Sequence, residues 1–433
     1  MPRFSTQPHV LVHSPRLTPR LEAALQWTWD AVLGLPWRHE PDLAAFVQSD
    51  AVWKLQYGGD SRVDGAFWME PEGLLDEVHL RQEPPASGQA GQDWLALIFW
   101  MGSRMEEWIE DAPRDVHGRF DPSASHPMQR GWLSVPICEQ WAFELGAHVL
   151  GKVWPEHRDR LKAEYAVEPT LDVDSAFAFQ GKGLWRTGGA LSRDVMRGDW
   201  SVAGRRWRVC KGRAPDPYNT YAQANKWHRE YGLEPRWFFL LARFGPHDKG
   251  LPANSTQLRK LMQDLESSLP GSVQWHPGYA SATDRGALER EFQSFVDIMG
   301  QAPVASRQHY LRMEPGTTRR NLLKLGVKED HTEGHAVCTG FRGGFTRPRQ
   351  WYDLDAEGLT PLMLHPFAAM DATLNRYQKV HPSAVAEHVA KLAAGVRPFG
   401  GTLRLLWHNE SLAPEGMWEG WGAVYPNVLQ AVS

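Results

Sequence analysis

The chain of 433 residues lacks several features that mark particular protein classes. Its 3 cysteines, Cys138, Cys210 and Cys338, lie far apart and form no CxxC or other metal-ligand spacing. An odd number of distant cysteines argues against a disulfide framework, so we expect reduced thiols. No apolar run is long enough to span a bilayer, and residues 1–17 lack the apolar core of a signal peptide. These absences predict a soluble, cytoplasmic protein with no integral membrane segment.

A strong charge imbalance is also missing. The net charge is −4, and the 42% hydrophobic and 23% charged residues are typical of a globular protein. This balance gives no general reason to expect nucleic acid or a membrane surface as a partner. Tryptophan, in contrast, is abundant, with 21 copies. Tryptophan rings can stack on sugars or simply fill a core, and composition leaves both open.

The length predicts two domains, or one large α/β barrel with an appendage. Residues 1–160 mix short strand candidates (10–12 and 51–57) with amphipathic helices, and they gather no His, Asp or Glu at a catalytic spacing. We therefore expect an N-terminal α/β domain of unknown role over 1–160 and a catalytic domain over 161–433.

Beyond residue 160, four short apolar runs each end in hydrogen-bonding or ionisable residues. Helical segments separate the runs, and one of these, residues 287–300, follows Asp284 and ends at a glycine. Strands that alternate with helices predict parallel βαβ units, whose carboxyl ends converge. The four runs end at 172–174, 247–248, 276 and 408.

The sharpest local feature is Asp172-Val173-Asp174. Residues i and i+2 of a strand face the same side, so both carboxylates could point into one cleft. Two close carboxylates repel each other unless a cation lies beside them. One could bind a divalent metal while the other acts as general base on a water molecule. The alternative is an Asp-rich turn that caps the next helix.

Two later stretches carry residues suited to the same site. His276 follows a strand rich in Val and Trp, where a neutral imidazole suits zinc or a similar ion. Arg307 could orient a carboxylate base through a bidentate pair, and His309 could be a further ligand. The alternative is that these histidines are hydrogen-bonded structural residues and that residues 305–313 form a basic edge at the surface.

The order of these motifs resembles the polysaccharide deacetylase superfamily (NodB-type, carbohydrate esterase family 4). That family has a Thr-aromatic-Asp-Asp motif on its first strand, then a His motif, an Arg motif and a late Leu-x-Leu-His motif. The counterparts here are residues 170–174, 275–277, 306–310 and 405–408. More closely, the chain resembles bacterial polysaccharide deacetylase family proteins with an uncharacterised N-terminal domain, on stretches such as "FGPHDKGL", "PFAAMDATL" and "LWHNESL".

The resemblance implies a deformed (β/α) barrel, preceded by a smaller α/β domain. It also implies a metal-dependent hydrolase that removes an acetyl group from an N-acetylated sugar or polysaccharide precursor. Asp172 would be the general base, supported by Arg307, and His408 the general acid. Asp174 and His276 would bind a divalent ion, Zn in the first place, with Co, Ni or Mn as alternatives.

The chain departs from the family at the second metal-binding histidine. That residue normally follows the first by four positions, but position 280 is Ala. His309 from the neighbouring motif is the expected replacement, and His247 is a second candidate. If neither reaches the metal, the ion is weakly held or the reaction differs.

Aromatic residues next to these motifs, Tyr279, Tyr310 and Trp407, are candidates for binding the carbohydrate substrate, and Glu410 is a candidate for orienting an imidazole. Two rival functions remain: hydrolysis of a non-sugar C–N bond, and non-catalytic carbohydrate binding. A glycosidase is disfavoured, because that chemistry needs two carboxylates facing each other across a bond. The exact substrate and the oligomeric state are not determined by the sequence.

Overall fold

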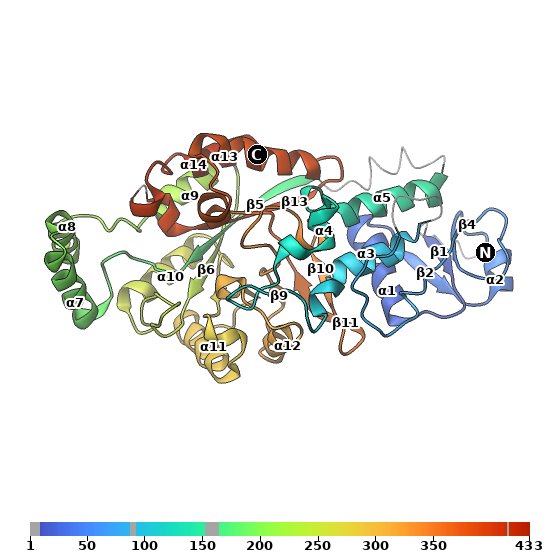
Figure 1. Ribbon diagram of the computed structural model, residues 1–433, viewed down its shortest axis with the longest axis horizontal. Helices are drawn as coiled ribbons and strands as arrows, with labels where there is room; N and C mark the ends of the chain where they lie inside the picture. The colour runs from blue at the N-terminus through green and yellow to red at the C-terminus, as the bar shows by residue number, and fades with distance from the viewer. Residues whose placement is uncertain (1–8, 87–91, 152–163, 414) are drawn as a thin grey trace, which may run out of the picture. The chain divides into compact units, whose positions relative to one another are not determined.

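The computed structural model describes residues 9–86, 92–151, 164–413 and 415–433. The chain divides into two compact units (Figure 1). Unit 1 comprises residues 1–166, 340–366 and 394–403, and unit 2 comprises residues 167–339, 367–393 and 404–433. Two late segments thus group with the N-terminal one, although the chain order gives no sign of this. The domain boundary at residue 160 and the roles of the two domains stay predictions.

Unit 1 is built on a four-stranded parallel sheet in the order β2-β1-β3-β4. The central strand β1 is buried along its whole length, as expected of a strand covered on both faces. The strands are β1 (Val10–His13), β2 (Trp37–Glu40), β3 (Trp53–Tyr57) and β4 (Phe67–Met69). The other elements are α1 (Pro19–Leu25), α2 (Leu43–Gln48), α3 (Trp94–Ser103), α4 (His126–Gln129), α5 (Ile137–Leu150) and the antiparallel pair β10 (Arg349–Asp353) and β11 (Gly358–Leu364).

Helix α3 forms the core of unit 1. All of its residues are buried, because it is apolar on every side. Asp93 caps its N-terminus by accepting a hydrogen bond from the amide of Ala96 at 2.9 Å. Gly102 permits close packing, since a Cβ there would lie only 2.8 Å from the ring of Trp27 and 2.9 Å from that of Phe345.

In unit 2 the strands follow the order β9-β8-β7-β6-β5-β13-β12. The neighbouring pairs from β5 to β9 are parallel, as are β12 and β13. The carboxyl ends of these strands therefore meet at one edge, which is called the carboxyl edge below. The strands are β5 (Tyr165–Val173), β6 (Arg236–Leu240), β7 (Val273–His276), β8 (Ala305–Ser306), β9 (Glu329–Asp330), β12 (Ala369–Met370) and β13 (Gly401–His408).

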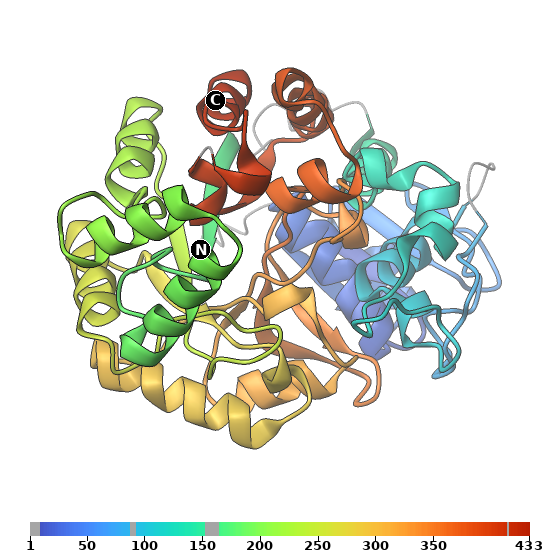
Figure 2. The same ribbon diagram turned by 60° about the vertical axis from the view of Figure 1, so that its left-hand side comes forward.

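Helices connect these strands, and in Figure 2 the green-to-yellow ones lie around the outside of the sheet. The expected start and end of one of them are confirmed: Asp284 caps α11 through the amide of Ala287, and Gly300 ends it with a φ of 74°. The helices are α7 (Gly183–Met196), α8 (Trp200–Cys210), α9 (Tyr221–Glu230), α10 (Thr256–Ser268), α11 (Arg285–Met299), α12 (Thr317–Lys324), α13 (Pro382–Val396) and α14 (Val424–Val432).

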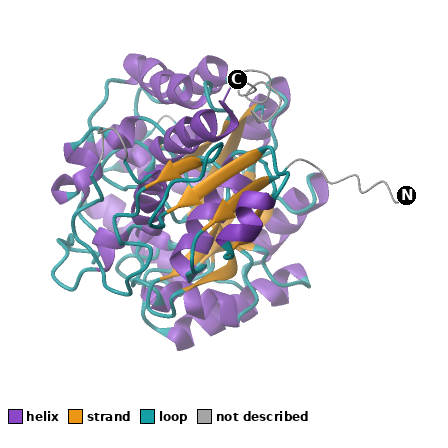
Figure 3. Ribbon diagram, turned by 90° about the vertical axis from the view of Figure 1, so that its right-hand side faces the viewer, coloured by secondary structure: helices purple, strands orange, loops and turns teal. Residues whose placement is uncertain are grey.

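The predicted α/β class is confirmed: two sheets and the helices that flank them make up the described chain (Figure 3). The closure of the unit 2 strands into a barrel stays a prediction. Within the described residues, none of the helices is both long and apolar enough to cross a membrane.

Candidate metal centre

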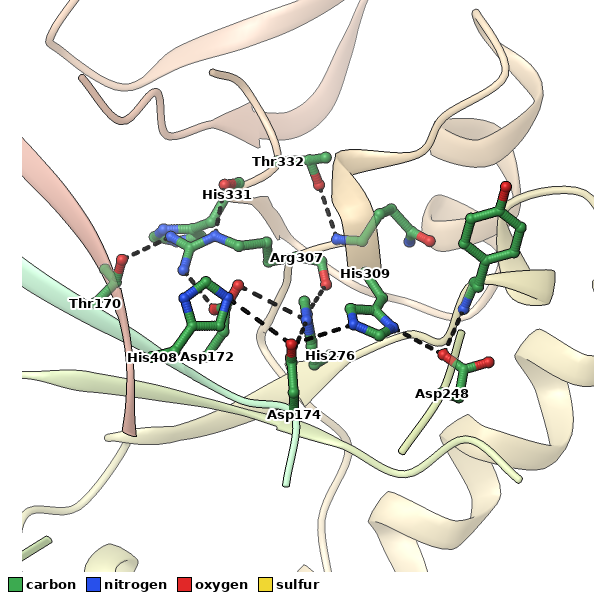
Figure 4. Close-up of polar contacts among 12 residues, drawn as sticks. Thr170, Asp172, Asp174, Asp248, His276, Arg307, His309, His331, Thr332 and His408 are labelled. Atoms are coloured by element: carbon green, nitrogen blue, oxygen red, sulfur yellow. Dashed lines mark hydrogen bonds and ion pairs between the residues drawn. The ribbon is translucent and has the colours of Figure 1, made fainter. Parts of the chain in front are cut away.

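The carboxyl edge of unit 2 brings together side chains from four strands (Figure 4). Asp172 and Asp174 lie at the end of β5, and His276 is the last residue of β7. Arg307 and His309 follow β8, and His408 ends β13. Polar groups that are scattered over the sequence from 172 to 408 thus converge because parallel strands deliver them to the same edge.

Asp174, His276 and His309 form a group that could hold a metal ion. One ligand atom from each lies within 4.8 Å of the others. The carboxylate of Asp174 is central: its Oδ1 is 3.3 Å from Nε2 of His276, and its Oδ2 is 3.3 Å from Nε2 of His309. One carboxylate and two imidazoles make a donor set that suits Zn²⁺ and similar ions.

Unpartnered polar atoms support this interpretation. Oδ1 of Asp174 and Nε2 of His276 are buried, and neither has a hydrogen-bond partner among the described residues. The other ring nitrogen of His276, Nδ1, lies 2.5 Å from the carbonyl oxygen of Arg307, which can only accept, so Nδ1 carries the proton. In the neutral ring, Nε2 then directs a lone pair at a carboxylate oxygen. A cation between these two atoms would remove the repulsion, so the residues fit a metal.

His309 is held by a second carboxylate. Its Nδ1 lies 2.7 Å from Oδ1 of Asp248, in the loop after β6, which turns Nε2 toward Asp174. Burial alone would lower the pKa of His309, but the carboxylates of Asp174 and Asp248 outweigh it and raise the pKa to about 9. For the acid Asp174 burial acts in the other direction and would raise the pKa. The neighbouring imidazoles outweigh burial and bring the pKa of Asp174 well below its ordinary value. The surroundings of Asp174 therefore favour positive charge next to it.

Asp172 lies beside the ligand group and has a different partner. Arg307, which is fully buried, donates from Nη1 to Oδ1 of Asp172 at 2.7 Å. Its second terminal nitrogen donates to Oγ1 of Thr170 at 2.8 Å. Arg307 therefore donates to one oxygen of Asp172 and does not form the expected bidentate pair. The other oxygen, Oδ2, is 3.7 Å from Nε2 of His276 and faces the ligand group.

His408 approaches from β13, the strand next to β5 in the sheet. Its Nδ1 is 2.7 Å from Oδ1 of Asp371, whose Oδ2 accepts the backbone amide of His408 at 2.8 Å. Nε2 is therefore directed to the site, 3.8 Å from Oδ2 of Asp174. Burial opposes ionisation of this ring, but Asp371 and the site carboxylates raise its pKa to about 10. Asp371, and not the predicted Glu410, holds Nδ1 of His408 and orients the ring.

The predicted aromatic residues are placed unequally. The rings of Tyr279 and Tyr310 lie 5.3 Å apart next to the ligand group, and Tyr310 is 4.7 Å from the ring of His309. Tyr310 has a φ of 61°, which is uncommon outside glycine and marks a backbone held by its surroundings. Trp407 is only 1% exposed and packs against Tyr425, so the structure does not bring it to the site.

His247 does not belong to the ligand group of Asp174, His276 and His309; its ring stacks on that of Tyr279 at 3.9 Å. Asp371 was missed in the sequence, and Asp248 was noted at the end of an apolar run but given no role. A signal existed for both: Asp248 follows the apolar run of β6, and Asp371 follows directly after β12. Asp371 follows a parallel strand directly, as Asp174 does, whereas Asp248 lies in the loop eight residues after the end of β6.

Comparisons with known proteins give limited information. Residues 10–155 match the model of a family of unknown function (DUF7033), which lies within unit 1. No curated protein matches the chain. Among solved structures, the chain is similar to a protein from Mycobacterium smegmatis that is described provisionally as a polysaccharide deacetylase. The identity is 16%, the TM-score is 0.39, and the match covers 63% of this chain and 84% of the other.

Proposed function

We propose that the carboxyl edge of unit 2 is the active site of a metal-dependent hydrolase that removes the acetyl group of an N-acetylated sugar. One observation carries this proposal. The ligand group Asp174, His276 and His309 is flanked by a carboxylate held by arginine and by an imidazole held by carboxylate. A base and an acid beside one cation are what amide hydrolysis requires.

A divalent ion in this group would polarise the amide carbonyl and lower the pKa of a nearby water molecule. Two protein residues carry out the proton transfers, one as acceptor and the other as donor. Asp172 accepts a proton on Oδ2, because Arg307 occupies Oδ1. His408 gives a proton from Nε2 to the departing nitrogen, since its Nδ1 is engaged by Asp371.

The choice of an N-acetylated sugar as substrate is supported by two features. The order of the strand-end motifs resembles that of polysaccharide deacetylases. Tyr279 and Tyr310 place two half-buried rings beside the ligand group, where one face of a sugar could pack. A cytoplasmic location and zinc as the resident ion remain part of this proposal.

The test combines metal content with acetate release. The full chain, loaded with Zn²⁺ and freed of excess metal, is expected to hold one ion per chain and to release acetate from N-acetylglucosamine oligosaccharides. Asp172→Asn should retain the ion but lose about 10²–10⁴-fold in rate, the usual contribution of a general base. Full activity in this variant would exclude Asp172 as the base, and failure to bind a divalent ion would overturn the proposed function.

A further inference from the structure

The segment between β5 and α9 folds into two helices that the metal centre does not use. Helices α7 (Gly183–Met196) and α8 (Trp200–Cys210), together with the residues up to Arg213, are called the α7–α8 hairpin here. Figure 1 shows the pair standing out from the sheet of unit 2. An element that projects in this way contributes little to the core and is free to meet a partner.

The hairpin exposes large apolar side chains in a regular pattern. Trp185 is 95% exposed and Met196 79%, and these two residues are eleven positions apart, or three helical turns. On α8, Trp200 is 69% and Trp207 45% exposed, seven positions or two turns apart. Trp185 and Met196 therefore lie on one side of α7, and Trp200 and Trp207 lie on one side of α8. Isolated apolar residues on a surface are ordinary, but this concentration in one segment marks an interaction surface.

The same hairpin is strongly basic. Residues 183–213 contain eight Arg or Lys and two Asp, a net charge of +6, in a chain whose net charge is −4. Five of these cations are exposed on the hairpin: Arg193, Arg197, Arg208, Lys211 and Arg213. The near-neutral balance of the whole chain thus conceals a local positive surface.

Other cations fix the hairpin to the loops at the carboxyl edge. Arg186 donates to the carbonyl oxygens of Gly250 and Lys249, at 3.0 and 3.2 Å, in the loop that also carries Asp248. Arg205 pairs with Glu415, which follows β13. The exposed surface is therefore tethered on the same side of unit 2 as the metal centre.

We propose that the α7–α8 hairpin docks on the surface of a lipid bilayer that contains anionic phospholipid. Tryptophan prefers the boundary between acyl chains and headgroups, while exposed Arg and Lys are attracted to anionic headgroups. A nucleic acid would use the cations and could stack on indoles, but it offers nothing to Met196 and Val202, which is 40% exposed. A bilayer accommodates both kinds of side chain. This inference is independent of the reaction catalysed at the metal centre.

The experiment measures co-sedimentation of the full chain with vesicles. Vesicles of phosphatidylcholine with about one third phosphatidylglycerol should bind the protein at least ~10-fold more tightly than phosphatidylcholine alone. Binding should weaken as salt shortens the range of the electrostatic attraction. The double variant Arg197→Gln/Arg208→Gln should bind ~25-fold more weakly, which corresponds to about fivefold for each basic residue near an anionic surface. Trp200→Ser/Trp207→Ser should lose at least ~10-fold.

Matched controls lie elsewhere on the chain. Val116→Ser removes a side chain that is 93% exposed in unit 1, and Lys324→Gln removes an exposed cation of α12; both should bind as the unaltered protein does. The altered side chains are exposed, so circular dichroism should show unchanged folding. The proposal is overturned if anionic vesicles do not bind the protein, or if binding survives both double variants. Preferential binding of single-stranded nucleic acid in competition with the vesicles would also overturn it.

Discussion

Two carboxylates, one in each unit, have opposite surroundings. Glu139 in unit 1 is fully buried, and both of its oxygens are engaged. Oε1 accepts from the amide and hydroxyl of Thr346, each at 2.8 Å, and from the amide of Arg347 at 3.0 Å. Oε2 accepts from Nη1 of Arg347 at 2.6 Å. Asp174 in unit 2, in contrast, has an oxygen without a hydrogen-bond partner among the described residues and imidazole nitrogens at 3.3 Å.

The difference separates a structural carboxylate from a ligand. A carboxylate whose lone pairs are all used holds the fold together and has nothing left for an ion. The space around the carboxylate of Glu139 is also closely packed. A Cβ at the neighbouring Gly401 would lie 2.3 Å from Oγ1 of Thr346 and 3.5 Å from Oε2 of Glu139. An oxygen that stays open in a buried site is costly to leave unpaired, which is the condition that a bound cation relieves. Both residues are acidic, but Glu139 is completely buried while the side chain of Asp174 is 21% exposed, and the two differ in their partners.

The largest expected effect comes from removing the open carboxylate. Asp174→Ala should weaken the binding of Zn²⁺ by more than the 10–100-fold that is typical of an outer residue, because a direct ligand is lost. The unfolding free energy of the metal-free protein should fall by less than in Glu139→Ala, because Oδ1 has no hydrogen-bond partner among the described residues and Oδ2 faces only imidazole nitrogens, at 3.3 and 3.8 Å. Competition with a chromogenic chelator measures the first quantity and urea unfolding the second. Zinc affinity equal to that of the unaltered chain would contradict the ligand assignment.

Glu139→Ala should show the reverse pattern. It leaves the guanidinium of Arg347 buried without its partner carboxylate, and breaking a buried pair costs about 3–5 kcal/mol. Zinc affinity should not change. Urea unfolding of the two variants side by side makes the comparison direct, with Glu289→Ala on the exposed face of α11 as control. A loss of stability below 1 kcal/mol would show that the fully bonded carboxylate is not structural.

A smaller effect is expected from the carboxylate that holds His309. Asp248→Asn removes the negative charge next to Nδ1, so zinc affinity should fall about 10–100-fold while overall stability is nearly kept. Asp264→Asn on α10 is the matched control, because its carboxylate is exposed and pairs only with Lys260. Unchanged zinc affinity in Asp248→Asn would mean that His309 needs no such support.

The smallest effect concerns a buried histidine outside the site. Nε2 of His228 lies 2.7 Å from the hydroxyl of Tyr425, and burial lowers its pKa to about 3. Below about pH 6.5, His228 therefore binds a proton in the unfolded chain but stays neutral in the folded chain. The free energy of unfolding consequently falls as the pH falls. Between pH 7 and pH 5 the loss from this residue should be about 2 kcal/mol. Urea unfolding of His228→Gln should lack this share of the loss, and an identical pH dependence would refute it.

Part of this molecule could be predicted from local sequence. The polar residues that end short apolar runs, such as Asp174 and His276, lie at strand ends. The strands of a parallel sheet are buried and apolar, so polar side chains occur where a strand ends. The helix over Arg285–Met299 follows from its capping aspartate and its final glycine. The aromatic prediction was less successful, since Trp407 is in the core: alternation along β13 does not tell which face of a doubly covered strand meets the site.

The sequence by itself determined the α/β class and the residue types at the strand ends, because both depend on periodicity and on short-range preference. Only the tertiary structure decided which histidine joins Asp174 and which carboxylates stand behind His309 and His408. Those choices depend on distances between strands that are 30 to more than 100 residues apart in the chain, and no local pattern encodes them. The grouping of residues 340–366 and 394–403 with unit 1 was decided in the same way, by packing and not by chain order.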